Sequence, residues 1–547
     1  MFDEPLLPVE VNAGSYAGKT LRERATGRFY THDVLATDLA ARLTEALIGR
    51  SQYRHVRALS VCDPFCGDGR LIVALLMTIA DTSALRRCRV TVTLRDIDSQ
   101  AVKVAGRNVI AAAQELDLDV VLREEIGDSF AIEHPPVYDI VITNPPWELL
   151  KPDTREMAHL SPAKSAAYRN WLKARCAQLD ARFPDAKADV AWAGWGTNLA
   201  RCGWDLALRS CRPGGAVGIV LPATILADQA SASMRRAALS RAKLVDLVTY
   251  PSEARLFAKV DQPVVAATFV AEAGGVVDAT LRLYGADRLE KATRHLSLSP
   301  KELDAVGYAL PVGFGAEAAG LLGLFSNFPQ FCDLEGNGPS DLWAGRELDG
   351  TGLHAKLRVT GQSPFISGRM VRRHEIAEWP SQFVPPDLAS RFRSVAFERL
   401  VWRDVTRSSQ RRRMIGTIIP TGWVTSNSLH VAYFRDGDRK RLCALHGVLS
   451  SFVFEFQIRS RLATGHMSLG IVRAARVPKI GKMLVKKIAP IVERVLATQS
   501  PEAQATLETK VAQAYGIDRD GFAAILAQFP KVDASERAML LDCSLWK

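Results

Sequence analysis

The tetrapeptide Asn144-Pro145-Pro146-Trp147 combines residue types that can hold a planar amine. The side-chain carbonyl of Asn144 and the backbone carbonyl of Pro145 can accept both hydrogens of an exocyclic amino group. Trp147 offers an aromatic face on which a planar ring can stack. Two consecutive prolines cannot continue a central strand, and they lock the backbone that presents the two carbonyl groups. We therefore interpret these four residues as the catalytic residues of an enzyme that acts on an aromatic amine.

A glycine-containing loop, residues 61–69, precedes this tetrapeptide. It reads Val-Cys-Asp-Pro-Phe-Cys-Gly-Asp-Gly and leads directly into a helical pattern. Gly67 and Gly69 let the backbone turn tightly against a ligand, and Asp63 can bind a cationic or hydroxylic group. A nicotinamide site is disfavoured, because the third glycine of its fingerprint is missing and an Asp-Pro pair precedes the glycines. Taken alone, the loop is equally compatible with a tight strand-to-helix turn.

Two further acidic residues follow the next two predicted strands. Asp96 ends the second strand, where a carboxylate can accept both hydroxyl groups of a ribose. Asp98 is placed to cap the helix that follows. Asp128 comes after the third strand-like stretch. Three carboxylates, including Asp63, after three successive strands predict one site at the edge of the sheet where the strands end.

These residues require a framework that brings the strand ends together. From residue 54 to residue 270, short apolar runs alternate with amphipathic helical patterns such as 71–80 and 100–116. The apolar runs are Arg57–Val61, Val90–Leu94, Tyr138–Ile142, Ala216–Val220, Leu244–Val248 and Val264–Val270. Such alternation is typical of an α/β fold with a mostly parallel sheet and helices on both faces.

The motifs and their order resemble those of the amino-group S-adenosylmethionine-dependent DNA methyltransferases. The resemblance is to the gamma-type adenine-N6 group and to large type II and IIG adenine modification enzymes. Besides the tetrapeptide and the glycine loop, it rests on residues 25–31 (Ala-Thr-Gly-Arg-Phe-Tyr-Thr), 212–222 (Arg-Pro-Gly-Gly-Ala-Val-Gly-Ile-Val-Leu-Pro) and 254–260 (Ala-Arg-Leu-Phe-Ala-Lys-Val).

The resemblance implies a Rossmann-like methyltransferase domain with a mostly parallel, seven-stranded sheet. A mixed α/β target-recognition domain and a helical C-terminal part would follow. We place the three parts at residues 1–275, 276–485 and 486–547.

The resemblance also implies a role for each matching residue of an S-adenosylmethionine site. Asp63 would lie near the methionine amino group, Asp96 would hold the ribose hydroxyl groups, and Asp128 would accept a hydrogen bond from the adenine amine. Ile97 would cover one face of that adenine. The implied cofactor residues are Tyr30, Thr31, Asp63, Phe65, Cys66, Gly67, Gly69, Asp96, Ile97, Asp128, Ser129, Asn144 and Pro146.

Aromatic residues would receive the target base. Trp147 would stack on an adenine rotated out of DNA, and Phe257 would contact its other side or its edge. Rotation of a base out of the duplex costs roughly a few kcal/mol, which stacking would offset. Two acceptors on the amine favour the pyramidal geometry that localises its lone pair, so no strong general base is required. Two positions depart from the family pattern: Ser129 stands where an aromatic residue is common, and Asp68 where a small one is usual.

Positive charge gathers in the second half of the chain. There are 70 Lys and Arg against 59 Asp and Glu, a net charge of +11, and residues 351–415 hold thirteen of the former against five of the latter. Guanidinium groups suit phosphate contacts and the reading of guanine edges, so this segment predicts contact with double-stranded DNA. A solvated basic surface is the alternative. The arginines expected at the DNA are Arg369, Arg372, Arg373, Arg403, Arg407, Arg411, Arg412 and Arg413.

Length and composition set further limits. The 547 residues exceed one ordinary core, and 48% hydrophobic with 24% charged residues is typical of a folded protein. No run of about 18 apolar residues and no signal-peptide pattern occurs, so we expect a cytoplasmic, prokaryotic, nucleoid-associated protein. The nine cysteines are scattered without a CxxC pair, which indicates reduced thiols and no metal site.

We expect a monomer, since an asymmetric DNA site needs no symmetric reader. Any cleavage in a restriction or phage-defence system is expected from a separately encoded nuclease or subunit.

Other functions stay open at this point. The tetrapeptide can accept any planar amine, so RNA, protein glutamine or the N4 of cytosine are alternative targets. The arginine load of the second half argues against a protein substrate. A different class of function is a non-catalytic or partner-dependent DNA-binding defence subunit that keeps the cofactor fold.

Overall fold

The computed structural model describes residues 31–152, 157, 160–188, 196–257, 262–310, 320–348, 356–406, 410–459 and 467–546, and the backbone of 15–16 and 19–20. The chain folds into two compact units, Met1–Pro300 and Lys301–Lys547, which we call unit 1 and unit 2. Tyr30 and Arg407 lie outside the described residues.

Unit 1 is built on a nine-stranded sheet with the strand order β13-β12-β10-β11-β9-β6-β3-β4-β5. All six predicted strands are present in it. Only β11 and β13 run antiparallel to their neighbours. The strands are β3 (Ala58–Asp63), β4 (Arg89–Asp96), β5 (Val120–Ile126), β6 (Tyr138–Thr143), β9 (Cys211–Pro222), β10 (Lys243–Tyr250), β11 (Val264–Val270), β12 (Val277–Tyr284) and β13 (Glu290–Leu298).

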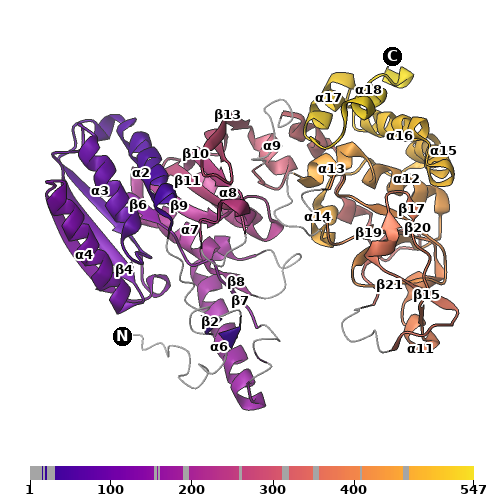
Figure 1. Cartoon of the computed structure of the whole chain (residues 1–547), viewed down its shortest axis with the longest axis horizontal. Helices are drawn as coiled ribbons and strands as arrows, with labels where there is room; N and C mark the ends of the chain where they lie inside the picture. Colours follow the sequence, from indigo (N-terminus) through magenta and orange to yellow (C-terminus); the bar gives the residue numbers. More distant parts are fainter. Residues whose placement is uncertain are drawn as a thin grey trace. The chain divides into compact units, whose positions relative to one another are not determined.

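Helices cover both faces of this sheet, as predicted (Figure 1). The helices α2 (Asp33–Ile48), α3 (Arg70–Asp81) and α4 (Ser99–Glu115) share one apolar core with alternate residues of the strands. The helix α7 (Leu199–Ser210) packs on β6 and β9, and its Trp204 contacts Phe269 of β11. Since Val264 and Ala266 belong to the core under α2 and α3, Phe269 points to the opposite face.

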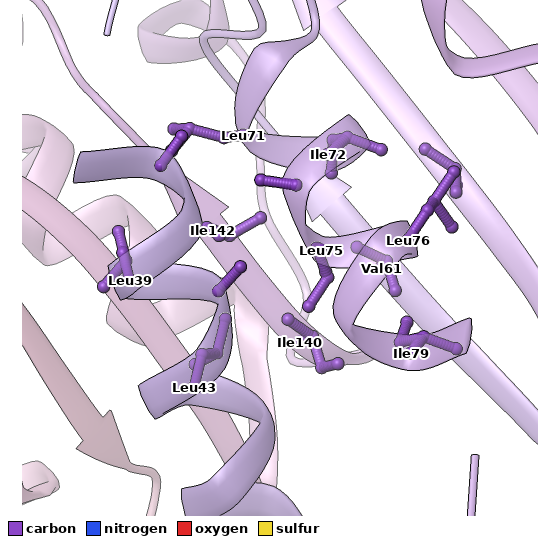
Figure 2. Packing of buried hydrophobic residues seen from close by; sticks show 14 of the residues in the cluster. Leu39, Leu43, Val61, Leu71, Ile72, Leu75, Leu76, Ile79, Ile140 and Ile142 are labelled. Carbon is purple, nitrogen blue, oxygen red and sulfur yellow. The ribbon is translucent and has the colours of Figure 1, made fainter. Parts of the chain in front are cut away.

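Figure 2 shows how the first core forms between α2, α3 and the strands β3 and β6. In α3 the apolar residues recur at the spacing of one helical face, which turns them toward the sheet. Full burial of one such side chain contributes about 2 kcal/mol. The residues that meet here are Leu39, Leu43, Val61, Leu71, Ile72, Leu75, Leu76, Ile79, Ile140 and Ile142.

The β12–β13 hairpin makes unit 1 larger than the sequence indicated. We expected a boundary near residue 275, but β12 pairs in parallel with β10 and thereby extends the sheet. The sheet has nine strands where seven were expected. The compact unit consequently ends at Pro300.

Unit 2 joins small sheets to a helical C-terminal part. A four-stranded sheet has the order β14-β22-β19-β20, and a three-stranded sheet has the order β18-β15-β21. The strands are β14 (Leu342–Gly345), β15 (Ser363–Ile366), β16 (Val371–Arg372), β17 (Glu375–Ile376), β18 (Phe383–Val384), β19 (Arg399–Arg403), β20 (Gly416–Ile419), β21 (Val424–Thr425) and β22 (Leu429–Phe434). Two short helices, α9 (Pro300–Ala305) and α11 (Pro386–Ala389), precede the C-terminal helices α12 (Arg439–Leu449), α13 (Phe452–Arg459), α14 (Leu469–Ala474), α15 (Lys482–Thr498), α16 (Pro501–Ala514), α17 (Arg519–Ala527) and α18 (Ala534–Leu541).

All nine cysteines are among the described residues, and each is a free thiol. Within the same ranges, no group of three or more His, Cys, Asp or Glu residues is arranged to hold a metal ion. None of the helices in this part of the chain combines the length and apolar character needed to cross a membrane.

Candidate active site

The predicted site residues meet at the edge of the sheet where the parallel strands end. Asp63, Asp96 and Asn144 end or directly follow β3, β4 and β6, which are neighbours in the sheet. Parallel strands bring their carboxyl ends to one edge, which is where ligands of this fold bind. We call it the carboxyl edge.

The glycine loop forms a tight turn against the second acidic residue. Gly67 and Gly69 have φ of 52° and 81°, in the left-handed region that favours glycine. A Cβ on Gly69 would lie 2.9 Å from the Cα of Ala105 in α4, so the position has no room for a side chain. The Gly67 amide donates to Oδ2 of Asp96 at 3.0 Å, while Oδ1 accepts from the Asp98 amide at 2.9 Å.

Asp98 caps α4 as predicted, because its side chain accepts from the backbone of Gln100.

Asp63 is a buried carboxylate at the end of β3, the middle strand of β6, β3 and β4. It is 1% exposed, and its Oδ1 accepts from the Phe65 amide at 3.1 Å and from Oγ1 of Thr143 at 2.7 Å. Its Oδ2 is buried and has no hydrogen-bond donor among the described residues. Burial raises the pKa of Asp63 to about 7, because the charged form is poorly solvated there. An ammonium group bound at Oδ2 would relieve that cost.

Asp128 is held by a residue that sequence reasoning missed. Its Oδ1 accepts from the Phe130 amide at 2.9 Å, and its Oδ2 forms an ion pair with Arg175. The two side chains are only 19% and 13% exposed. Arg175 belongs to the helix α6 (Pro162–Arg182), which follows the tetrapeptide in the chain. Nothing in that helical pattern signals the contact, because it depends on how the helix packs.

Ser129 stands where the family pattern usually has an aromatic residue, and the structure shows what this serine and the next residue, Phe130, do instead. The hydroxyl of Ser129 donates to the carbonyl of Pro64 at 2.5 Å, and the side chain is buried. Phe130 is also buried, with its ring centroid 5.0 Å from that of Phe65. Phe130 therefore supplies aromatic surface next to the glycine loop. Cys66 is buried, whereas Ile97 is 39% exposed and presents an apolar surface.

Asn144 contacts the N-terminal segment that carries part of the predicted cofactor site. Its Nδ2 donates to Oγ1 of Thr31 at 3.1 Å, and both residues are buried. The backbone carbonyl of Thr31 accepts from Arg70 at 2.9 Å. Because Thr31 takes a donor hydrogen of the amide, the acceptor oxygen of Asn144 lies on the other side of that group.

Pro145 packs closely on α7. A Cβ on Gly203 would lie 2.3 Å from Cβ of Pro145 and 3.4 Å from the ring of Phe65. Glycine inside a helix costs about 1 kcal/mol relative to alanine, so the close approach has to offset that cost. Sequence reasoning missed Gly203, because a lone helical glycine does not reveal its neighbour. Pro146 is buried beside Pro145.

The two residues predicted to contact a target base lie together. The ring centroids of Trp147 and Phe257 are 4.9 Å apart, with an interplanar angle of 67°. Phe257 is 5% exposed, whereas Trp147 is partly exposed beside the same core. Residues more than a hundred positions apart in the sequence thus form one aromatic wall beside Asn144.

Several arginines of unit 2 have a structural role that the sequence did not indicate. Arg412 contacts Glu455 at 2.9 Å and Glu508 at 3.3 Å, and Arg373 contacts Glu508 at 2.6 Å. The backbone amide of Arg413 donates to Glu455, and its side chain is 9% exposed. Both carboxylates are completely or almost completely buried. We therefore correct the expected phosphate contacts of these three residues, since Arg412 and Arg413 are buried and Arg373, 17% exposed, is held by Glu508.

The remaining predicted arginines are more exposed. Arg411 is half-exposed and pairs with Glu536 at 2.6 Å. Arg403 donates to the backbone carbonyls of Val371 and Arg369. Arg369 is 73% exposed, with a weak pair to Glu378 at 3.8 Å, and Arg372 is exposed on β16, which forms a hairpin with β17.

Several solved structures are similar to this chain at low sequence identity, and no family model matches the chain. The type IIL restriction-modification enzyme MmeI, solved in complex with DNA, aligns with 91% of this chain and 76% of its own, at a TM-score of 0.52 and 12% identity. The DrdV–DNA complex aligns with 87% of this chain and 57% of its own, at a TM-score of 0.49 and 10% identity. A putative class I S-adenosylmethionine-dependent methyltransferase from Listeria monocytogenes aligns with 47% and 65%, at a TM-score of 0.32 and 14% identity.

The chain spans less than two thirds of the length of the last two proteins. The likeness to MmeI concerns the fold, because identity is low. Together with the observed sheet, it confirms the predicted fold class: a Rossmann-like α/β domain, then a mixed α/β part and a helical C-terminal part.

Proposed function

We propose that this chain is a site-specific DNA methyltransferase that transfers a methyl group from S-adenosylmethionine to the N6 of an adenine rotated out of the duplex. It would serve a restriction-modification or phage-defence system. One observation carries the proposal. Thr143, which precedes the tetrapeptide at the end of β6, donates a hydrogen bond to Asp63 at 2.7 Å, and Asn144 donates one to Thr31 at 3.1 Å. The tetrapeptide therefore adjoins two predicted cofactor residues.

The residues at the carboxyl edge fit the proposed cofactor. The buried Oδ2 of Asp63 has no donor among the described residues and suits an ammonium group. Backbone hydrogen bonds from Gly67 and Asp98 to its two oxygens fix the Asp96 carboxylate at the end of β4, where it would face the ribose hydroxyl groups. Asp128 is fixed in the same manner by Phe130 and Arg175. When bound, S-adenosylmethionine supplies an electrophilic methyl group on a sulfonium.

The protein's own part in the transfer is to bind and orient the target amine. The carbonyl oxygens of Asn144 and Pro145 would accept its two hydrogens and favour a localised lone pair. Thr31 would hold the amide of Asn144 in the required orientation. Trp147 would stack on the base in place of its neighbours in the duplex. No side chain needs to act as a strong base, because the proton can leave after transfer.

Unit 2 would supply recognition of the duplex. Arg369 lies just before the β16–β17 hairpin and Arg372 lies on it, and both are exposed. They are the remaining predicted residues best placed for phosphate contacts. Recognition by a separate unit is compatible with a monomeric enzyme in the cytoplasm.

The test is to incubate the purified chain with labelled S-adenosylmethionine and unmethylated plasmid DNA, and to identify the methylated nucleoside by mass spectrometry. We expect N6-methyladenine, and sequencing of the methylated plasmid gives the recognition site. An Asp96→Ala variant should bind S-adenosylhomocysteine more weakly. N4-methylcytosine, or transfer only to RNA or protein, would contradict the proposed target.

A further inference from the structure

The turn between β12 and β13 lies at the carboxyl edge, outside all of the predicted motifs. Because β12 is parallel to β10, its last residue, Tyr284, ends at the same edge as Tyr250, the last residue of β10. The segment 251–257 that follows β10 ends in Phe257. The hairpin turn 285–289 and the aromatic wall therefore belong to one edge of the sheet.

Arg288 joins the hairpin turn to that wall. Its Nε donates to the carbonyl of Ala254 at 3.0 Å, three residues before Phe257. Arg288 also lies close to His32: burial first, and then the charge of Arg288, lower the pKa of His32. His32 follows Thr31, the partner of Asn144. The guanidinium of Arg288 thus lies beside the segment that leads to Phe257.

A second arginine accompanies it. Arg255 follows Ala254 directly and is exposed. Arg255 and Arg288 have φ of 47° and 62°, in the left-handed region, which costs a residue other than glycine about 1 kcal/mol. Backbone bonds to Ser252 and Gly285 hold these conformations. Such strain tends to be kept where a side chain must point in a particular direction.

The two guanidinium groups are not neutralised within the described part of the chain. Neither arginine has an ion pair there, although acidic residues are close in sequence. Those acids have other partners: Glu253 contacts Ser252, Asp287 pairs with Lys291, and Glu290 pairs with Arg282. With Nε of Arg288 used by Ala254, its terminal nitrogens remain as donors for an anion.

We propose that Arg255 and Arg288 form a site for a backbone phosphate of the DNA next to the extruded base. This rests on the proposed function and names a contact outside the arginines predicted from the sequence. Guanidinium groups bind phosphate oxygens through two parallel hydrogen bonds. A nucleotide that leaves the stack must have its backbone held, and this site is positioned to hold it while Trp147 receives the base.

The experiment measures the affinity of a duplex carrying the recognition site as a function of KCl, in the presence of S-adenosylhomocysteine. Arg255→Asn and Arg288→Asn remove the charge, and asparagine tolerates the left-handed backbone. Arg288→Lys restores the charge. Arg107→Gln, at an exposed arginine on α4, is the matched control.

For each Asn variant we expect the slope of log affinity against log salt to fall by about 0.9, the value for one lost phosphate contact. Arg288→Lys and Arg107→Gln should keep the wild-type slope. A neutral methylphosphonate beside the target adenine should weaken binding by the wild type but add no further loss in Arg288→Asn.

Unchanged slopes in both Asn variants of an active methyltransferase would overturn the phosphate site and leave the proposed function intact. Reduced slopes in a chain that transfers no methyl group would support the phosphate site and overturn the proposed function. A wild-type chain that does not bind DNA would overturn both.

Discussion

Buried charge is handled differently at the carboxyl edge of unit 1 and in the arginine-rich part of unit 2. Asp63 is buried without a cationic partner among the described residues, and burial raises its pKa to about 7. Glu455 is just as buried, but Arg412 and Arg459 contact it, both at 2.9 Å. A buried charge costs several kcal/mol unless it is paired. At the carboxyl edge, the free-energy cost of burying the Asp63 carboxylate remains, and a cationic ligand can relieve it. In unit 2, Arg412 and Arg459 already offset the corresponding cost for Glu455.

The largest effect is expected from breaking the paired region. Glu455→Ala removes the buried carboxylate that Arg412 and Arg459 share and leaves Arg412 only its longer contact to Glu508, which should lower the free energy of unfolding of unit 2 by about 3–5 kcal/mol. Urea unfolding followed by circular dichroism measures it. Glu398→Ala is the control, because its pair with Arg439 is exposed and should contribute less than about 1 kcal/mol. Similar small losses in both variants would contradict the comparison.

At the carboxyl edge, Asn144→Ala should act on chemistry and not on folding. Removal of one of two acceptors for the amine should lower kcat about 100- to 1000-fold. The affinity for S-adenosylhomocysteine, measured by calorimetry, should stay near the wild-type value. If affinity falls as far as kcat, Asn144 supports the fold and does not serve the transfer.

The unpaired carboxylate predicts a pH dependence. In the unfolded chain Asp63 releases its proton near the ordinary aspartate pKa of 3.8, whereas the folded protein keeps it up to about pH 7. Its contribution to stability is therefore fully present below pH 4 and is lost as the pH rises to 7.

Ligand binding should show the opposite trend. An ammonium group binds the ionised form of Asp63, so affinity for S-adenosylhomocysteine should rise about tenfold between pH 6 and pH 8. Calorimetry at the two pH values tests this. Asp63→Asn should remove the dependence, and a dependence that persists would assign it to another group.

The smallest effect is expected at the ion pair of Asp128. Arg175→Ala should weaken S-adenosylhomocysteine binding about fivefold, because the carboxylate loses the partner that fixes it. Arg169, exposed on the same helix, provides the control variant Arg169→Ala. Equal affinities of the two variants would place Arg175 outside the cofactor site.

The success of sequence reasoning differed between the two regions for a physical reason. Asp63, Asp96 and Asn144 were placed correctly at one edge because each follows a recognisable strand, and parallel strands bring their ends together. Trp147 and Phe257 were brought together for the same reason.

Charge composition carries no such positional information. It could not distinguish Arg412, buried against Glu455, from Arg369, exposed to solvent. Arg175 and the β12–β13 hairpin were missed because their positions depend on packing between elements, which no local pattern records.

The close approach of Gly203 to Pro145 gives a criterion for comparing other sequences with this one. The tetrapeptide can be retained by a gene copy that no longer makes an active enzyme, so its presence alone does not identify working copies. A single methyl group at Gly203 would collide with Pro145, whose carbonyl is proposed to bind the target amine. A related chain that has an intact tetrapeptide but a larger residue at the position of Gly203 is therefore expected to be inactive, unless its helix corresponding to α7 lies farther from the proline.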